Sequence, residues 1–307
     1  MQCDILPPMR WRRCWHLVAL SALVGCVQFH PRHPPWLQQP AAAKDAAATD
    51  AAAAATTAEP AAGDDGKVDA VTAALVWRVV GQSVQGRPLR ATSIGYGPRR
   101  VLWIGGIHGD EREGRIATRE LPSAFAATPG AMRAVTLTIL EDSNPDGSAQ
   151  NTRGNSNGVD LNRNFPAVNF KPHRMFGIKP LSQPESGAVH DLILQLKPEL
   201  IIVAHSWHDD RFINFDGPAE ALAQRFSRLS GYALRVSEDI APTPGSLGSW
   251  VGHTLGMPIL TLEYRRGSDP RTAWQQTRVA ILAVVLGDSV QGPVTALARG
   301  SRCPAIV

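Results

Sequence analysis

Val101-Leu-Trp-Ile-Gly-Gly-Ile107 is an apolar run that leads directly into His108-Gly-Asp-Glu111. An uninterrupted apolar run is typical of a central strand covered on both faces, and we expect a strand over 100–107. A helical pattern follows over 111–126, which places the histidine and the glutamate at a turn between strand and helix. An imidazole and a carboxylate converging at such a turn suit zinc. Taken singly, the four residues fit a capped helix start with a solvated Glu111 equally well.

Apolar runs of the same kind recur along the chain and alternate with helical patterns. A hairpin is predicted from 76–80 and 91–96, and a long polar loop over 141–182. Further strands are expected over 134–140, 200–204, 212–215, near 234 and over 258–262, and helices over 183–196, 218–229, 247–255 and 271–286. The alternation predicts an α/β fold, a single domain with a mixed, mainly buried central sheet flanked by helices on both faces.

Two more chemically active side chains fall at predicted strand ends. His205 follows the strand over 200–204, and Glu263 ends the strand over 258–262. Binding sites in open α/β sheets gather at the carboxyl ends of the strands. We therefore expect His108, His205 and Glu263 to meet there.

The first 25 residues have the features of an export signal. Three arginines precede the short apolar segment 17–24, and Leu23-Val-Gly-Cys26 resembles the bacterial lipobox, whose cysteine is acylated. We predict a lipoprotein signal peptide over 1–25, lipidation of Cys26, and an exported protein held to a membrane in the bacterial periplasm. An ordinary secretory peptide and a stub of membrane helix are the alternatives, and Met9 is an alternative start to Met1.

Composition divides the rest of the chain. Residues 26–70 are rich in alanine and proline without an apolar stripe and are predicted to be a flexible tether, followed by a folded domain over 71–290 and a C-terminal tail over 291–307. Once the signal is removed and Cys26 is lipidated, Cys303 has no partner, so no disulfide framework is expected. The net charge of +4 includes no basic run and gives no indication of a nucleic-acid partner.

The long loop contains Asn151-Thr-Arg153-Gly-Asn-Ser-Asn-Gly-Val-Asp160-Leu-Asn162-Arg163-Asn-Phe-Pro166. Together with His108-x-x-Glu111, Ala-His205-Ser-Trp and Leu-Thr-Leu-Glu263-Tyr, this segment closely resembles the M14 zinc carboxypeptidase family. The motifs span residues 81–263 in the family's order. Gly81-Gln-Ser, Asn144-Pro-Asp-Gly and Gly245-Ser-Leu-Gly-Ser-Trp250 resemble its murein peptide amidase subgroup.

The resemblance implies a role for each motif residue. One zinc ion per chain would be held by His108, Glu111 and His205, with the fourth position open for a water molecule. Asp160 would orient a ligand histidine, and Glu263 would be the general base that takes the proton of the zinc-bound water. Arg153 would stabilise the oxyanion, and Asn162 and Arg163 would bind the terminal carboxylate of the substrate.

One departure bears on the substrate. Digestive carboxypeptidases place a mobile tyrosine upstream of the base, where this chain offers only Trp250, and Tyr264 on a strand should face away from the site. Arg265 and Arg266 are expected to be exposed charges beyond a strand end, and binding of a second substrate carboxylate is the alternative. His173, His190, His208 and His253 are expected on loops or the surface, with His208 close enough to His205 to line the site.

The resemblance therefore implies a zinc-dependent hydrolase of cell-wall peptides that cuts the γ-D-glutamyl–diaminopimelate bond of a murein peptide with a free carboxylate. Two alternatives stay open. An aspartoacylase or succinylglutamate desuccinylase shares the zinc site but carries an additional domain after the base, where only residues 264–307 follow here. A non-catalytic wall-peptide-binding lipoprotein is disfavoured because the ligands, the base and Arg153 are all present.

Overall fold

The computed structural model describes residues 74–236, 240 and 243–288. Strands and helices alternate along this part of the chain, as predicted. The strands are β1 (Arg78–Gln82), β2 (Pro88–Ile94), β3 (Arg99–Ile104), β4 (Val135–Leu140), β5 (Leu200–Trp207), β6 (Phe212–Asp216), β7 (Ala233–Val236) and β8 (Ile259–Arg265). The helical elements are α2 (Arg115–Ala126), α3 (Ala131–Ala134), α4 (Pro145–Gln150), η2 (Leu161–Arg163), α5 (Pro184–Leu196), α6 (Glu220–Ser230), η4 (Ser249–Thr254) and α7 (Pro270–Leu286).

The strands form one sheet in the order β1-β2-β4-β3-β5-β8-β6-β7. Strands β4, β3, β5 and β8 run parallel to one another in its centre. The predicted hairpin of β1 and β2 adds antiparallel strands on one side, and β6 pairs antiparallel with β8 on the other. The sheet is therefore mixed, and the predicted fold class is confirmed.

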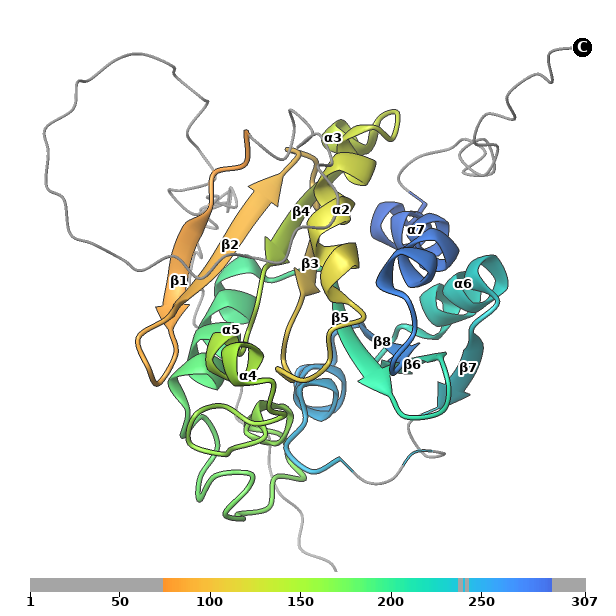
Figure 1. Ribbon diagram of the computed structural model, residues 1–307. Helices are drawn as coiled ribbons and strands as arrows, with labels where there is room; N and C mark the ends of the chain where they lie inside the picture. The colour runs from red at the N-terminus through yellow and green to blue at the C-terminus, as the bar shows by residue number, and fades with distance from the viewer. Residues whose placement is uncertain (1–73, 237–239, 241–242, 289–307) are drawn as a thin grey trace, which may run out of the picture. The chain divides into compact units, whose positions relative to one another are not determined.

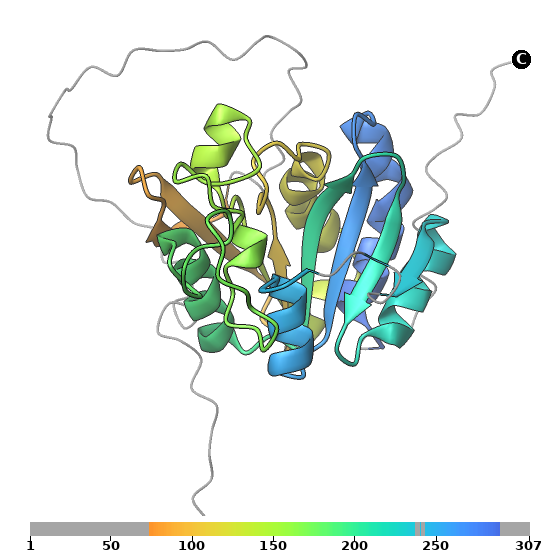
Figure 2. The ribbon, with the colours of Figure 1, turned by 90° about the horizontal axis from the view of Figure 1, so that it is seen from below.

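Helices cover both faces of the sheet (Figures 1 and 2). The main hydrophobic core joins the sheet to α2, α6 and α7, which lie on one face, while α5 and η4 lie on the other. Trp103 of β3 is fully buried, and its indole Nε1 donates to Thr118 Oγ1 of α2 over 2.8 Å. Tyr264 also faces this core, with its hydroxyl 3.3 Å from Thr277 Oγ1 of α7, so its predicted orientation away from the site is confirmed.

The structure corrects three predicted boundaries. Helix α2 begins at Arg115, because residues 105–114 form a loop in which the Glu111 amide donates to the His108 carbonyl and turns the chain. Strands β5 and β8 continue to Trp207 and Arg265, so His205 and Glu263 lie inside strands instead of at their ends.

The long polar segment also contains regular structure. Helix α4 interrupts it, with Asn144 Oδ1 accepting from the Gly147 amide at 3.0 Å and a proline in the first turn. An asparagine cap followed by proline is a helix-start signal that the sequence carried. The predicted helix over 247–255 is present as the π-helical segment η4.

The predicted signal peptide, Cys26 and the tether fall within residues 1–73, and Cys303 and the tail fall within 289–307. All of them lie outside the described residues and stay predictions. None of the helices in the described ranges has both the length and the apolar character needed to cross a membrane.

Candidate active site

A loop over residues 105–114 brings the first two candidate ligands to the carboxyl end of the sheet. The segment that follows β4 holds this loop in place, since the Ser143 amide donates to the Gly105 carbonyl at 2.9 Å and Asn144 Nδ2 donates to the Ile107 carbonyl at 3.3 Å. Gly109 packs against the backbone of α4 so closely that a Cβ there would lie 2.0 Å from the Gly147 carbonyl carbon. The 105–114 loop therefore needs glycine where it meets α4.

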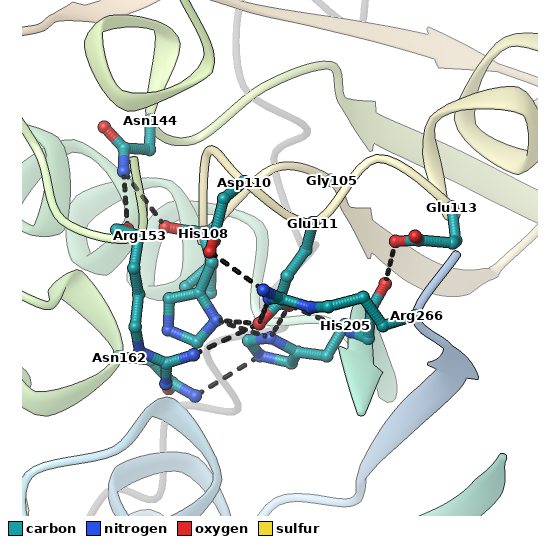
Figure 3. A network of polar contacts seen from close by, with 12 residues as sticks. Gly105, His108, Asp110, Glu111, Glu113, Asn144, Arg153, Asn162, His205 and Arg266 are labelled. Atoms are coloured by element: carbon teal, nitrogen blue, oxygen red, sulfur yellow. Dashed lines mark hydrogen bonds and ion pairs between the residues drawn. The ribbon is translucent and has the colours of Figure 1, made fainter. Parts of the chain in front are cut away.

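His108, Glu111 and His205 meet in one buried cluster (Figure 3). Nδ1 of His108 lies 2.8 Å from Glu111 Oε1, and Nδ1 of His205 lies 2.9 Å from Glu111 Oε2. The two Nδ1 atoms are 3.1 Å apart. Both imidazoles thus turn the same ring nitrogen toward one point beside the carboxylate.

This cluster fits zinc. Each residue offers one ligand atom, and the three atoms lie within 4.8 Å of one another. Two imidazole nitrogens and one carboxylate oxygen are the donor set of many catalytic zinc sites. Burial alone would raise the pKa of Glu111, but the two histidines hold this pKa well below its ordinary value, so the side chain is a carboxylate that can bind a cation.

Asp160 and Arg153 support the cluster from one side. Asp160 Oδ1 lies 3.0 Å from Nε2 of His108, the ring nitrogen that faces away from Glu111. A carboxylate in this position fixes the tautomer and the orientation of a ligand histidine. Burial would lower the pKa of His108, but Glu111 and Asp160 together raise it to about 9. Arg153 Nε donates to Asp160 Oδ2 at 2.9 Å, and its Nη1 donates to Glu111 Oε1 at 3.2 Å.

Glu263 lies on β8 directly beside His205 on β5, because the two residues are partners in the parallel register. Its side chain is buried, and Oε2 has no hydrogen-bond partner among the residues described. Burial and the nearby Glu111 raise the pKa of Glu263 to about 8. A carboxylate in this state accepts a proton readily, which suits a general base.

Asn162 and Arg163 also reach the cavity in front of the cluster, which has a volume of about 290 Å³. Asn162 Nδ2 lies 3.2 Å from His205 Nε2, and its Oδ1 accepts from the Leu247 amide at 2.9 Å. Arg163 Nη1 donates to the Asn162 carbonyl at 2.7 Å. All eight predicted site residues of the folded domain are thus brought together, seven on the cavity wall and Asp160 behind His108.

The sequence interpretation of Arg266 was wrong. Its guanidinium Nη1 donates to Asp110 Oδ2 at 3.1 Å, and its Nη2 lies 3.6 Å from Glu111 Oε1, so the side chain folds back over the cluster (Figure 3). Arg265 is exposed, as expected. Alternation along β8 would place Arg266 on the side of Tyr264, but β8 ends at Arg265, and the turn that follows directs the Arg266 side chain back to the cluster.

Of the remaining histidines, His173 and His253 are exposed, as predicted. His208 is exposed and does not line the cavity, whereas Trp207 does. His253 of η4 lies on the cavity wall, with Nε2 2.9 Å from Asp216 Oδ1 of β6. His190 stacks on Trp250 with ring centroids 4.8 Å apart. The pairing of Asp216 with His253 joins elements that lie far apart in the sequence, so sequence reasoning missed both residues.

Comparisons with known proteins agree with this geometry. Residues 73–221 match the family model described as zinc carboxypeptidase. Murein peptide amidase A of Escherichia coli (strain K12) is 31% identical over 179 residues, which cover 53% of this chain and 70% of that protein. Murein peptide amidase A of Vibrio campbellii is 28% identical over 207 residues, covering 60% of this chain and 77% of the relative.

Solved structures show the same fold. The crystal structure of the murein-tripeptide amidase from Escherichia coli O157 superposes with a TM-score of 0.57 at 25% identity, covering 74% of this chain and 98% of that one. Carboxypeptidase A from Helicoverpa armigera, at 17% identity, has a TM-score of 0.57 over 70% of each chain. The second likeness concerns the fold alone. The sequence, the fold and the His-Glu-His cluster agree with one another. This chain is a zinc-dependent peptide hydrolase that belongs to the zinc carboxypeptidase family and, within it, to the subgroup similar to murein peptide amidase A.

Proposed function

We propose that this protein hydrolyses the γ-D-glutamyl–diaminopimelate bond of murein peptides whose diaminopimelate carries a free carboxylate. The observation that supports the catalytic part is Glu263, a buried carboxylate that shares one cavity with the His108–Glu111–His205 cluster and has one oxygen without a partner among the described residues. The relatives named murein peptide amidase support the substrate class.

The metal would be held by His108, Glu111 and His205. Zinc bound there acidifies water and polarises the scissile carbonyl group. Glu263 takes one proton from the attacking water, whose oxygen forms the new bond to the carbonyl carbon. The same carboxyl then gives the proton to the amide nitrogen as the C–N bond breaks, so that an acid and an amine leave.

Two arginines serve different parts of the substrate. Arg153 is held at Nε by Asp160 and is 44% exposed, so its guanidinium can donate to the negative charge that develops on the carbonyl oxygen. Arg163 lines the same cavity beside Asn162, and its planar guanidinium suits bidentate binding of the terminal carboxylate. In this proposal the scissile bond lies between the metal cluster and Arg163.

The far wall of the cavity supports a diamino acid as the residue that carries the carboxylate. Polar side chains form this wall, namely Asn214, Asp216, Ser246, Ser249, His253 and Thr261. The Asp216 carboxylate would attract an ammonium group on the substrate side chain, and the amide and hydroxyl groups would bind its polar end. A large apolar side chain would lie against these polar groups without offering them a hydrogen bond.

The test is hydrolysis of L-Ala-γ-D-Glu-diaminopimelate by the zinc-loaded protein, with products identified by mass spectrometry. We expect L-Ala-D-Glu and free diaminopimelate, and no cleavage of the same peptide with an amidated C-terminus. N-acetylaspartate and N-succinylglutamate form a further arm, and their preferential cleavage would favour the deacylase interpretation. Binding of the tripeptide without cleavage of any substrate would favour a wall-peptide-binding protein.

We also propose that the protein is exported to the bacterial periplasm and anchored to a membrane by lipid on Cys26. The support is the sequence of the first 26 residues and the tether predicted over 26–70. In this proposal the zinc peptidase domain is the segment over 71–290. A tether of this length would let the domain reach wall peptides on the order of 35 Å from its anchor.

A further inference from the structure

Glu113 is a buried acid that the proposed mechanism does not use. Glu113 is only 7% exposed, and it lies two positions after Glu111 near the end of the 105–114 loop. Burying a carboxylate is costly unless strong hydrogen bonds compensate. Glu113 has two: Ser206 Oγ donates to Oε2 at 2.6 Å, and the Gly267 amide donates to Oε1 at 2.7 Å.

These two contacts join the three segments that form the site. Ser206 follows the candidate ligand His205 on β5, and Gly267 follows β8, which carries Glu263. The Ser206 amide in turn donates to Glu111 Oε2 at 2.9 Å. A continuous path therefore runs from Glu113 through Ser206 to the carboxylate of the candidate metal ligand.

Arg266 adds a charge to the same assembly. The Gly267 amide that Glu113 holds lies directly after this arginine, whose guanidinium pairs with Asp110 and lies 3.6 Å from Glu111 Oε1. Glu113 therefore also fixes the backbone from which Arg266 returns over the cluster. An apolar side chain would pack in this position without making either hydrogen bond.

We propose that Glu113 is a positioning residue that holds the Glu111 carboxylate in its metal-binding orientation, through Ser206, and keeps β8 in place beside it. The inference rests on the proposed role of Glu111 as a zinc ligand. Glu113 touches neither substrate nor metal in this arrangement. Its effect should appear first in zinc affinity and not in substrate binding.

The test measures zinc dissociation constants by competition with a chelator for wild type, Glu113→Met and Glu113→Gln. Methionine keeps the volume and loses both contacts, so we expect about 10- to 100-fold weaker zinc binding. Glutamine can accept from the Gly267 amide and donate to Ser206 Oγ, so it should restore affinity to within a few-fold of wild type. Glu120→Met on α2, where the side chain is 42% exposed and pairs with its neighbour Arg119, is the matched control.

Ser206→Ala removes one of the two contacts of Glu113, and it tests the proposal if Glu113→Met does not fold. If the path is real, Ser206→Ala weakens zinc binding, and the double variant loses less than the sum of the two single losses. Wild-type zinc affinity in folded Glu113→Met or in Ser206→Ala would overturn the proposal, as would equal losses in Glu113→Met and Glu120→Met. Because zinc affinity is measured without substrate, this outcome is separate from failure of the peptide to be cut.

Discussion

Glu263 is an acidic side chain in a buried position, where burial disfavours its charged form. Its carboxylate lies beside Glu111 in a buried position, and one of its oxygens has no partner among the described residues. If it is the general base, Glu263→Gln keeps the shape and the zinc but cannot accept the proton of water. We expect kcat to fall by about 10²- to 10⁴-fold with KM little changed, measured by steady-state hydrolysis of the tripeptide.

Arg163→Ala provides the contrast for that measurement. Loss of a carboxylate-binding guanidinium should raise KM more than it lowers kcat, because this contact is already made in the bound substrate. Zinc content is measured in each variant. Undiminished turnover by zinc-loaded Glu263→Gln would remove Glu263 from the mechanism.

The same residue should make the metal-free protein sensitive to pH. Its pKa rises from 4.5 to about 8 on folding, so between these values the folded state keeps a proton that the unfolded state has lost. The free energy of unfolding therefore decreases as pH rises through this window. In chelator-treated protein, Glu263→Gln should be more stable than wild type at pH 8 and nearly equal to it at pH 4.

Urea denaturation of both proteins at the two pH values checks this. Glu120→Gln controls for removal of one partly exposed carboxylate from the surface of α2. If the stability difference between wild type and Glu263→Gln does not grow from pH 4 to pH 8, the carboxyl is not protonated in the metal-free fold.

At the scale of elements, the contact between the 105–114 loop and α4 decides whether the ligands converge. A Cβ on Gly109 would meet the α4 backbone at 2.0 Å, and backbone cannot move aside as a flexible side chain can. We expect Gly109→Ala to lower the free energy of unfolding by about 1–3 kcal/mol and to weaken zinc binding.

Gly187→Ala in α5 is the matched substitution, because a Cβ at Gly187 has no heavy atom within 4 Å. Alanine in a helix should raise the free energy of unfolding by about 0.5–1 kcal/mol and leave zinc affinity unchanged. Chemical denaturation and chelator competition measure both quantities. A Gly109→Ala variant as stable as wild type would show that the loop and α4 are not closely packed in solution.

At the scale of the whole molecule, the prediction concerns the anchor. Cys26→Ser removes the sulfur to which the lipid would be attached, so the protein should leave the membrane fraction while the peptidase domain keeps its activity. Metabolic labelling with a radioactive fatty acid, followed by fractionation, tests wild type and variant together. Cys303→Ser is the control, since it removes another cysteine and should leave labelling unchanged. A wild-type protein that incorporates no labelled fatty acid would contradict the lipoprotein prediction.

Much of the fold and the site was predictable because it depends on local pattern. The apolar run before His108 and the one before His205 each indicated a buried strand, and both strands are central in the sheet. The period of two along a strand was enough to predict that Tyr264 faces away from Glu263. The candidate metal and substrate residues were named from motifs, since the spacing of residue types within a short segment is visible in the sequence itself.

The tertiary structure alone decided which distant segments meet. The register that sets Glu263 beside His205, the path from Glu113 through Ser206 to Glu111, and the return of Arg266 to Asp110 all join residues far apart in the chain. So does the pair of Asp216 and His253 on the cavity wall. Such contacts follow from strand order and side-chain packing, which depend on the fit of the whole core, and residue spacing along one segment carries no record of them.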